Sequence, residues 1–164
     1  MKAFLGLGSN IGDRRENIEY ALSVLQSSGF VELEALSQIY ETSPIGHKQR
    51  DFYNMCIQVQ TSLSAHNLLF LLKDIEKLLG RKKAKRWAAR IIDIDILFYE
   101  QKIVKTNTLN IPHKEIENRL FVLKPLSEIA PNLKHPILNR KIKEILQEKL
   151  LTLACQKIII APQI

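Results

Sequence analysis

Apolar and polar residues along the first hundred positions follow two different periods, which distinguish strands from helices. A continuous apolar run at 2–8 predicts a buried strand. Apolar residues then recur at helical spacing after Asp13 and again after Ser64, two residue types that commonly cap helices. Gly29 and Gly80 end these two predicted helices, because glycine readily adopts the left-handed conformation that follows a last helical turn.

Three further stretches have strand character. Residues 30–42 and 52–62 alternate between apolar and polar side chains, and 91–99 is rich in isoleucine. The loop at 43–51 is charged and long for a hairpin connection, which indicates a binding loop. The order is β-α-β-β-α-β, which predicts an α+β fold: a ferredoxin-like βαββαβ antiparallel sheet with two helices packed on one face.

The periodicity is weaker beyond residue 100. The elements expected there are an extended piece near 109–111, helices around 117–129 and 139–150, and an extra strand or an apolar tail at 157–160. We expect one domain over residues 1–150, followed by a C-terminal extension at 151–164 whose role the pattern does not indicate.

Composition narrows the class of protein. The chain has 164 residues and a formal net charge of +7, which favours an anionic partner such as a nucleotide, a nucleic acid or an acidic lipid. Cys56 and Cys155 lie far apart and outside any metal-binding spacing, so free thiols in a reducing compartment are expected. No apolar run has the length of a membrane span or of a signal peptide core, and we expect a cytoplasmic protein.

Asp93 and Asp95 are the sharpest chemical feature. On a strand both carboxylates point to one face, with their Cα atoms about 7 Å apart, while the isoleucines between and beside them point to the core. Paired carboxylates on a rigid strand suit Mg²⁺, which prefers oxygen ligands and bridges nucleotide phosphates. The alternative is an acidic strand side that simply faces solvent.

Basic residues crowd the segment just before this pair. Residues 81–90 include six lysines and arginines, and Trp87 lies among them. A polyphosphate needs metal on some of its oxygens and guanidinium groups on others, and a tryptophan in a charged loop can close over a ligand. Two alternatives remain open at this point: a solvated basic loop, and single-stranded nucleic-acid binding by basic and aromatic residues.

Two weaker candidates accompany these residues. His113 and Arg119 bracket a polar segment and offer a proton carrier and a charge to a phosphate site, although a histidine after a proline is more often a surface turn residue. Phe52 and Asn54 lie on one face of a predicted strand, where they suit a flat heterocycle through stacking and paired hydrogen bonds. Ordinary cross-strand packing is the alternative.

Glycines at 6, 8 and 12 resemble a dinucleotide-binding fingerprint only superficially. The spacing is G-x-G-x-x-x-G, and the elements that follow do not alternate as parallel βαβ units do. No P-loop pattern G-x-x-x-x-G-K-[ST] is present. We therefore expect these glycines to form a tight turn into the first helix.

Many short motifs recur in one order along the chain. They are GSN at 8–10, YETSPIG at 40–46, FYN at 52–54, GR at 80–81, RWAARIIDIDIL at 86–97, IPH at 111–113, NRLF at 118–121 and PLSEIAP at 125–131. Over roughly residues 3–136 the sequence resembles the 6-hydroxymethyl-7,8-dihydropterin pyrophosphokinases of folate biosynthesis. The resemblance implies a ferredoxin-like α+β fold and a monomer that transfers the β,γ-pyrophosphoryl group of ATP to the pterin hydroxymethyl oxygen and releases AMP.

The resemblance also implies roles for individual residues. Asp93 and Asp95 would hold two Mg²⁺ ions and, with Arg81 and Arg90, form the catalytic set. The nucleotide would be contacted by Glu76, Arg81, Trp87, Arg90, His113 and Arg119. The pterin would be bound by Asn54 and by backbone groups of Thr42, Pro44 and Ile45, sandwiched between Phe52 and Phe121, and covered by Trp87 on a closing loop.

The sequence departs from the family pattern in places. Ala88 and Ala89 stand where Gly-Pro is common, and Thr108 replaces a frequent basic residue. The basic loop is about one residue short, so Lys82 or Lys83 substitutes for a second arginine.

A nucleic-acid-binding module is the competing class of protein. In such a module Asp93 and Asp95 would repel phosphate without metal, and the sequence contains no RRM aromatic motif. A non-catalytic relative is disfavoured because the full set of chemical residues is kept. We therefore expect ATP and the pterin as partners, with no nucleic acid and no membrane.

Overall fold

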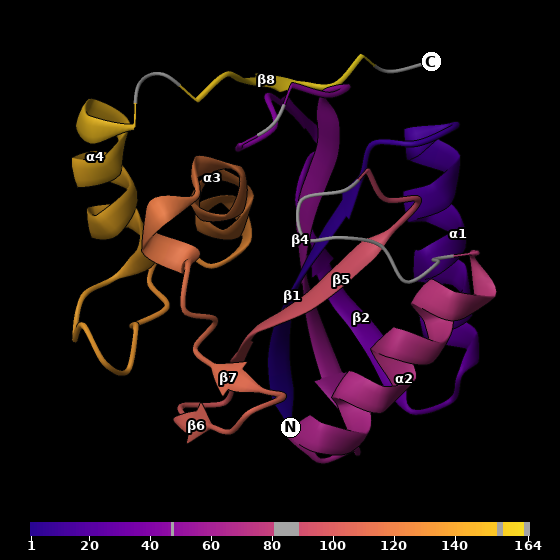
Figure 1. Ribbon diagram of the computed structural model, residues 1–164. Coiled ribbons are helices and arrows are strands. Elements are labelled where there is room, and N and C mark those ends of the chain that lie inside the picture. Colours follow the sequence, from indigo (N-terminus) through magenta and orange to yellow (C-terminus); the bar gives the residue numbers. More distant parts are fainter. Residues whose placement is uncertain (47, 81–88, 154–155, 163–164) are drawn as a thin grey trace.

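The computed structural model describes residues 1–46, 48–80, 89–153 and 156–162 (Figure 1). Its strands are β1 (Lys2–Ser9), β2 (Val31–Leu36), β3 (Tyr40–Thr42), β4 (Phe52–Thr61), β5 (Asp93–Tyr99), β6 (Val104–Lys105), β7 (Asn110–Ile111) and β8 (Ile158–Ile160). Its helices are α1 (Arg14–Ser27), α2 (Ala65–Leu78), the 3₁₀ turn η1 (Ile116–Asn118), α3 (Leu120–Ile129) and α4 (Ile142–Thr152). No helix among these residues is long and apolar enough to cross a membrane.

Six of the strands form one antiparallel sheet. The order is β5-β1-β4-β3-β8, and β2 also pairs with β4. The central strand β1 is bonded along its length to β4 on one side and to β5 on the other, so that Gly8 lies opposite both Asn54 and Asp93. The mixed α/β architecture and the antiparallel sheet expected from the sequence are confirmed. The short pair β6-β7 forms a separate two-stranded sheet.

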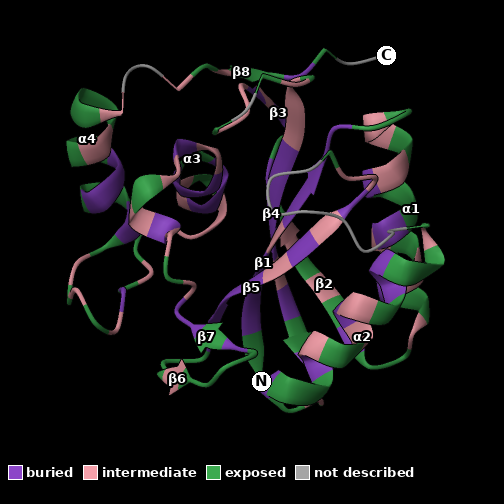
Figure 2. Cartoon of the chain, in the orientation of Figure 1, coloured by how far each residue is buried: buried purple, intermediate pink, exposed green. Residues whose placement is uncertain are grey.

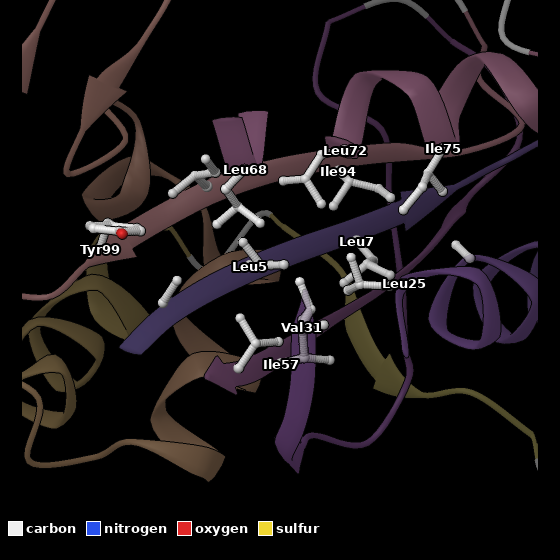
Figure 3. Packing of buried hydrophobic residues seen from close by; sticks show 14 of the residues in the cluster. Leu5, Leu7, Leu25, Val31, Ile57, Leu68, Leu72, Ile75, Ile94 and Tyr99 are labelled. Carbon is white, nitrogen blue, oxygen red and sulfur yellow. The ribbon is translucent and has the colours of Figure 1, made fainter. Parts of the chain in front are cut away.

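Helices cover both faces of the sheet. Helices α1 and α2 lie side by side on one face, and α3 and α4 lie on the other (Figure 1). Strand residues alternate between the two cores: Leu5, Leu7 and Ile94 belong to the core under α1 and α2 (Figure 3), whereas Phe4 and Leu97 belong to the core under α3 and α4. The second helical layer was not placed by the sequence pattern.

The predicted helix caps are confirmed. The Asp13 carboxylate accepts hydrogen bonds from the backbone N–H groups of Arg15 and Glu16, and the Ser64 hydroxyl accepts one from Asn67 N. Gly80 follows α2 with a φ of +91°, a conformation that favours glycine. The two best-predicted helices are therefore those whose ends are bounded by short-range signals.

The stretch 30–42, predicted as one strand, is two strands. Pairing with β4 shifts register between Leu33 and Ala35. Ser37 then separates β2 from β3, because its N–H donates to Cys56 O and its hydroxyl accepts from Cys56 N. The expectation of an extra strand or an apolar tail at 157–160 resolves in favour of a strand, since β8 pairs with β3.

Candidate active site

A cleft of about 510 Å³ opens on the sheet face that α3 and α4 cover only in part. Its walls come from β1, β4, β5, the segment after β3, and the residues around η1 and the start of α3. Figure 2 shows buried sheet residues bordered by partly exposed ones in this region. The predicted site residues that line the cleft are Thr42, Pro44, Ile45, Phe52, Asn54, Arg90, Asp93, Asp95, His113, Arg119 and Phe121.

Asp93 and Asp95 both face the cleft, as the strand period predicted. Their side chains are 23% and 37% exposed, whereas Ile94 between them is fully buried in the opposite core. Arg90 forms an ion pair with Asp93. His113 Nε2 lies 3.9 Å from Asp95 Oδ2. Arg90 thus holds Asp93 in place, and both carboxylates remain accessible from the cleft.

The donor set fits Mg²⁺ bound jointly with a substrate. No cluster of three or more histidine, cysteine or acidic side chains occurs among the residues that the structure describes. Mg²⁺ is usually held by one or two carboxylates, with waters and substrate phosphates completing its shell. Asp93 and Asp95 match that requirement.

Gly6 and Gly8 form the cleft floor, which corrects the expectation that they make a turn. Both lie within β1 and line the cleft. A Cβ on Gly8 would come within 2.7 Å of Asn54 Oδ1, so a side chain there would displace the amide. Only Gly12, with a φ of +63°, belongs to the turn before α1. Glycines two apart in a predicted strand are the signal that could have indicated a bare strip of backbone on one face.

The part of the cleft around Asn54 suits a flat polar ring. The Asn54 side chain is only 7% exposed, and its Nδ2 donates to Thr42 Oγ1 over 2.7 Å. This bond orients the amide at the bottom of the cleft. The rings of Phe52 and Phe121 line the same cavity. Arg119 lies over the Phe121 ring, with 5.6 Å between the guanidinium carbon and the ring centroid.

Asn10 was part of a motif but had no role in the sequence argument. Asn10 is buried, and its side-chain Oδ1 accepts from the backbone N–H of Arg90 over 2.7 Å. The backbone N–H of Asn10 donates to Arg90 O over 3.0 Å. Its Nδ2 donates to Gln49 Oε1 over 3.0 Å. Asn10 therefore connects the backbone at Arg90 with the loop before β4, a link between segments far apart in sequence.

His113 presents one defined nitrogen toward Asp95. The backbone N–H of His113 donates to Leu97 O, which ties this segment to β5. The ring atom Nδ1 accepts from the backbone N–H of Glu115 over 3.2 Å. Burial lowers the pKa of His113 below its ordinary value, and this outweighs the opposing effect of the Asp95 carboxylate. With Nδ1 accepting, the neutral ring carries its proton on Nε2, where it can donate toward the cleft.

Glu76 lies apart from the cleft surface. It is 1% exposed, accepts from Ile94 N over 2.8 Å, and pairs with Lys73 Nζ at 2.8 Å. Burial raises the pKa of Glu76, an effect that the Lys73 ammonium and the Ile94 N–H oppose. Lys73, a site residue that the sequence pattern did not indicate, pairs with Glu76 and lines the cleft. The nucleotide contact expected of Glu76 stays a prediction.

Four candidate residues lie outside the described part of the chain. They are Arg81, Lys82, Lys83 and Trp87, and their roles stay predictions. Among the described residues, the lysines and arginines that line the cleft are Lys73, Arg90, Lys114 and Arg119. The cleft thus brings carboxylates and cations together near an aromatic and amide pocket.

Comparison with known proteins assigns the family. The sequence profile of the 7,8-dihydro-6-hydroxymethylpterin-pyrophosphokinases matches residues 4–131. The chain belongs to this pyrophosphokinase family. The enzyme class that the motifs indicated is thereby confirmed.

Similar proteins cover nearly the whole sequence. A 2-amino-4-hydroxy-6-hydroxymethyldihydropteridine pyrophosphokinase from Aquifex aeolicus (strain VF5) is 41% identical over 153 residues, covering 93% of this chain and 94% of its own. The protein of the same name from Bacillus subtilis (strain 168) is 42% identical over 129 residues, covering 78% of this chain and 77% of its own.

A solved structure has the same fold. The crystal structure of wild-type Plasmodium falciparum HPPK-DHPS with SDX-DHP superposes with a TM-score of 0.75 at 18% identity. The match covers 93% of this pyrophosphokinase chain and 45% of that longer chain. At this identity the likeness concerns the fold alone.

Proposed function

We propose that the chain transfers pyrophosphate from ATP to the hydroxymethyl group of 6-hydroxymethyl-7,8-dihydropterin, releasing AMP, as a step of folate biosynthesis. One observation carries the proposal: a single cleft holds Asn54 and Asp93 on the two strands that flank Gly8. A ring bound against Asn54 would therefore present a substituent toward the paired carboxylates. The strand order and connectivity of β1 to β5 further support a ferredoxin-like arrangement.

Asp93 and Asp95 would hold two Mg²⁺ ions together with phosphate oxygens of ATP. Bound there, the metal would supply charge neutralisation on the phosphates and polarise the attacking hydroxyl. The ion pair between Arg90 and Asp93 keeps the guanidinium beside the carboxylates, where it can stabilise charge on the transferring group. Asn10 would maintain this position through its two hydrogen bonds to the Arg90 backbone.

The triphosphate would lie along the basic side of the cleft. His113, through Nε2–H, and Arg119 offer donors there, and Lys73 adds an ammonium whose orientation is set by Glu76. Arg81 and Trp87 remain predictions for the same ligand and for loop closure. This distribution supports a nucleotide position between β5 and the η1–α3 region.

The pterin would occupy the pocket under Phe121. Asn54 would bond its polar edge, and the aromatic rings of Phe52 and Phe121 would exclude water from its faces. Because Thr42 fixes the Asn54 amide, the pocket is ordered before the ring enters. The segment Thr42–Ile45 would supply backbone donors and acceptors at the ring margin.

Product analysis tests the proposal directly. The protein is incubated with ATP, Mg²⁺ and 6-hydroxymethyl-7,8-dihydropterin, and the nucleotides are separated by anion-exchange chromatography. AMP that forms in step with a pyrophosphorylated pterin, and only when pterin and Mg²⁺ are both present, is the expected result. ADP would indicate an ordinary kinase, and salt-sensitive RNA binding without turnover would favour the nucleic-acid alternative.

A further inference from the structure

Two consecutive residues near the C-terminus hold opposite walls of the cleft. Gln156 lies against the η1–α3 junction, where its side chain accepts from Leu120 N over 3.0 Å and donates to Asn118 O over 3.1 Å. Lys157 lies against the segment that follows β3, where Ser43 N donates to Lys157 O and Lys157 N donates to Ser43 Oγ. We propose that Gln156 and Lys157 are positioning residues that set the two walls of the substrate cleft; this rests on the proposed function.

Gln156 acts on the wall that carries Arg119 and Phe121. Arg119 occupies the N-cap position of α3 but makes no side-chain capping bond. Without a cap the first N–H groups of a helix lack partners. Gln156 supplies one from outside the helix and bonds the backbone on both sides of Arg119. The direction of Arg119 and of the Phe121 ring, both at the cleft, thus depends on a residue that does not itself line it.

Lys157 acts on the wall that carries Pro44 and Ile45. Its backbone bonds to Ser43 continue the pairing of β8 with β3 by one residue. Its ammonium lies 2.9 Å from the Asp51 carboxylate, at the other end of the loop that these residues begin. One residue therefore holds both ends of the loop that leads from β3 to β4.

The strand that follows anchors both contacts. β8 pairs with β3 through Ile158–Ile160, at the edge of the sheet shown at the top of Figure 1. Ala161 is buried and its N–H donates to Ile39 O, and Pro162 O accepts from Arg15 of α1. The segment is held along its length by hydrogen bonds, so Gln156 and Lys157 belong to a fixed strand segment and not to a loose tail.

The test compares single variants of Gln156 and Lys157 with two control variants in the adjoining strand β8. Lys157→Ala keeps the backbone bonds to Ser43 and removes the ammonium from Asp51, which frees the end of the loop next to Phe52. We expect the Kd of the pterin, titrated by fluorescence with Mg²⁺ and a non-hydrolysable ATP analogue, to rise about threefold, the scale of a surface ion pair. The Kd of the analogue without pterin should not change. Lys157→Arg should restore pterin binding, because it keeps the pair with Asp51.

Gln156→Ala should raise both constants, because it also frees Arg119. The control variants Ile159→Ala and Ile160→Ala alter side chains that are 47% and 59% exposed and keep the strand bonds, so both constants should stay at the wild-type value. Amide hydrogen exchange of peptides spanning 48–52 and 118–122 should accelerate in Lys157→Ala and Gln156→Ala respectively, because the first loses its pair with Asp51 and the second its bonds to Asn118 and Leu120.

Three outcomes would overturn the assignment. A lowered melting temperature with unchanged pterin and nucleotide constants would show that the two residues support only the fold. Unchanged exchange at both walls would contradict the positioning role. A wild-type chain that binds no pterin would overturn the proposed function and this assignment with it, whereas a binding wild type with indifferent variants would overturn this assignment alone.

Discussion

The two faces of strands β1 and β5 have opposite characters although their residues alternate one by one. Leu5, Leu7 and Ile94 are closed under α1 and α2, with at most 2% exposure (Figure 3). Their neighbours Gly8 and Asp95 line an open cleft. A period of two thus allows one strand to supply core and active site together. The rigid core on one side is what holds the chemical groups of the other in place.

The open face is itself divided. Where it carries apolar residues, such as Phe4 and Phe98, α3 and α4 pack on it and exclude water. Where it carries Gly8, Asn54 and the aspartates, no helix of the described chain covers it, and a cleft results. Helices cover apolar surface because its burial is favourable, and burying ionised carboxylates would be costly. The boundary of the site is therefore set by the same energetics as the core.

Removing a carboxylate from the open face should give the largest effect. We expect Asp95→Ala to lower AMP formation by at least about a thousandfold, because transition-state charge loses its metal support. The side chain is 37% exposed, so the melting temperature should hardly change. Asp74→Ala, which alters an exposed aspartate of α2, is the control. Near-wild-type turnover at saturating Mg²⁺ would exclude Asp95 from the mechanism.

The adjacent residue on the closed face should show the reverse. Ile94→Ala leaves a cavity among Leu7, Leu72 and Ile75 and should lower the free energy of unfolding by about 2–5 kcal/mol. Urea denaturation measures this loss, and activity per folded molecule at low temperature should persist. The milder Ile94→Val should cost about 0.5–1.5 kcal/mol. A catalytic defect without destabilisation would contradict the division between the faces.

A substitution in the cleft floor should have an effect of intermediate size on pterin binding. In Gly8→Ala the new Cβ would meet Asn54 Oδ1 at 2.7 Å, so the amide must move and pterin affinity should fall about tenfold, as for the loss of one well-placed hydrogen bond. Gly6→Ala is the matched control, because its Cβ would make ordinary contacts of 3.5 Å with Leu97. Equal pterin constants, measured by fluorescence titration, would refute a steric role for the floor.

The smallest expected effect concerns pH. His135 is buried against Phe98, and its Nδ1 accepts from the N–H groups of Ile137 and Leu138. Burial lowers the pKa of His135 below its ordinary value of 6.5, which outweighs the opposite influence of Glu117. The unfolded chain therefore binds the proton first, and stability is full above the ordinary pKa and is lost as pH falls from there through the lowered value.

Urea unfolding of wild type and His135→Asn at about pH 7.5 and about pH 5.5, either side of the ordinary pKa, measures this linkage. The wild type should lose more unfolding free energy between the two conditions than the variant does. Identical pH dependence would show that His135 keeps its ordinary pKa in the folded state.

Short-range signals account for what could be predicted. Helices α1 and α2 followed from their caps and periodicity, and the shared face of Asp93 and Asp95 followed from the period of a strand. The split between β2 and β3 could not be predicted, because it depends on bonds from Ser37 to Cys56 across the sheet. The position of Lys73 at the cleft could not be predicted, because it depends on how α2 packs beside β5.

The sequence by itself determined the ends of α1 and α2, the strand character of β1, β4 and β5, and the chemical types at the site, since each depends on the local order of residues. Only the tertiary structure decided that Gly8 lies between Asn54 and Asp93, and that Gln156 and Lys157 hold the cleft walls. These contacts join segments distant in the chain through sheet register and helix packing. Register and packing are properties of the assembled sheet, and no local pattern specifies them.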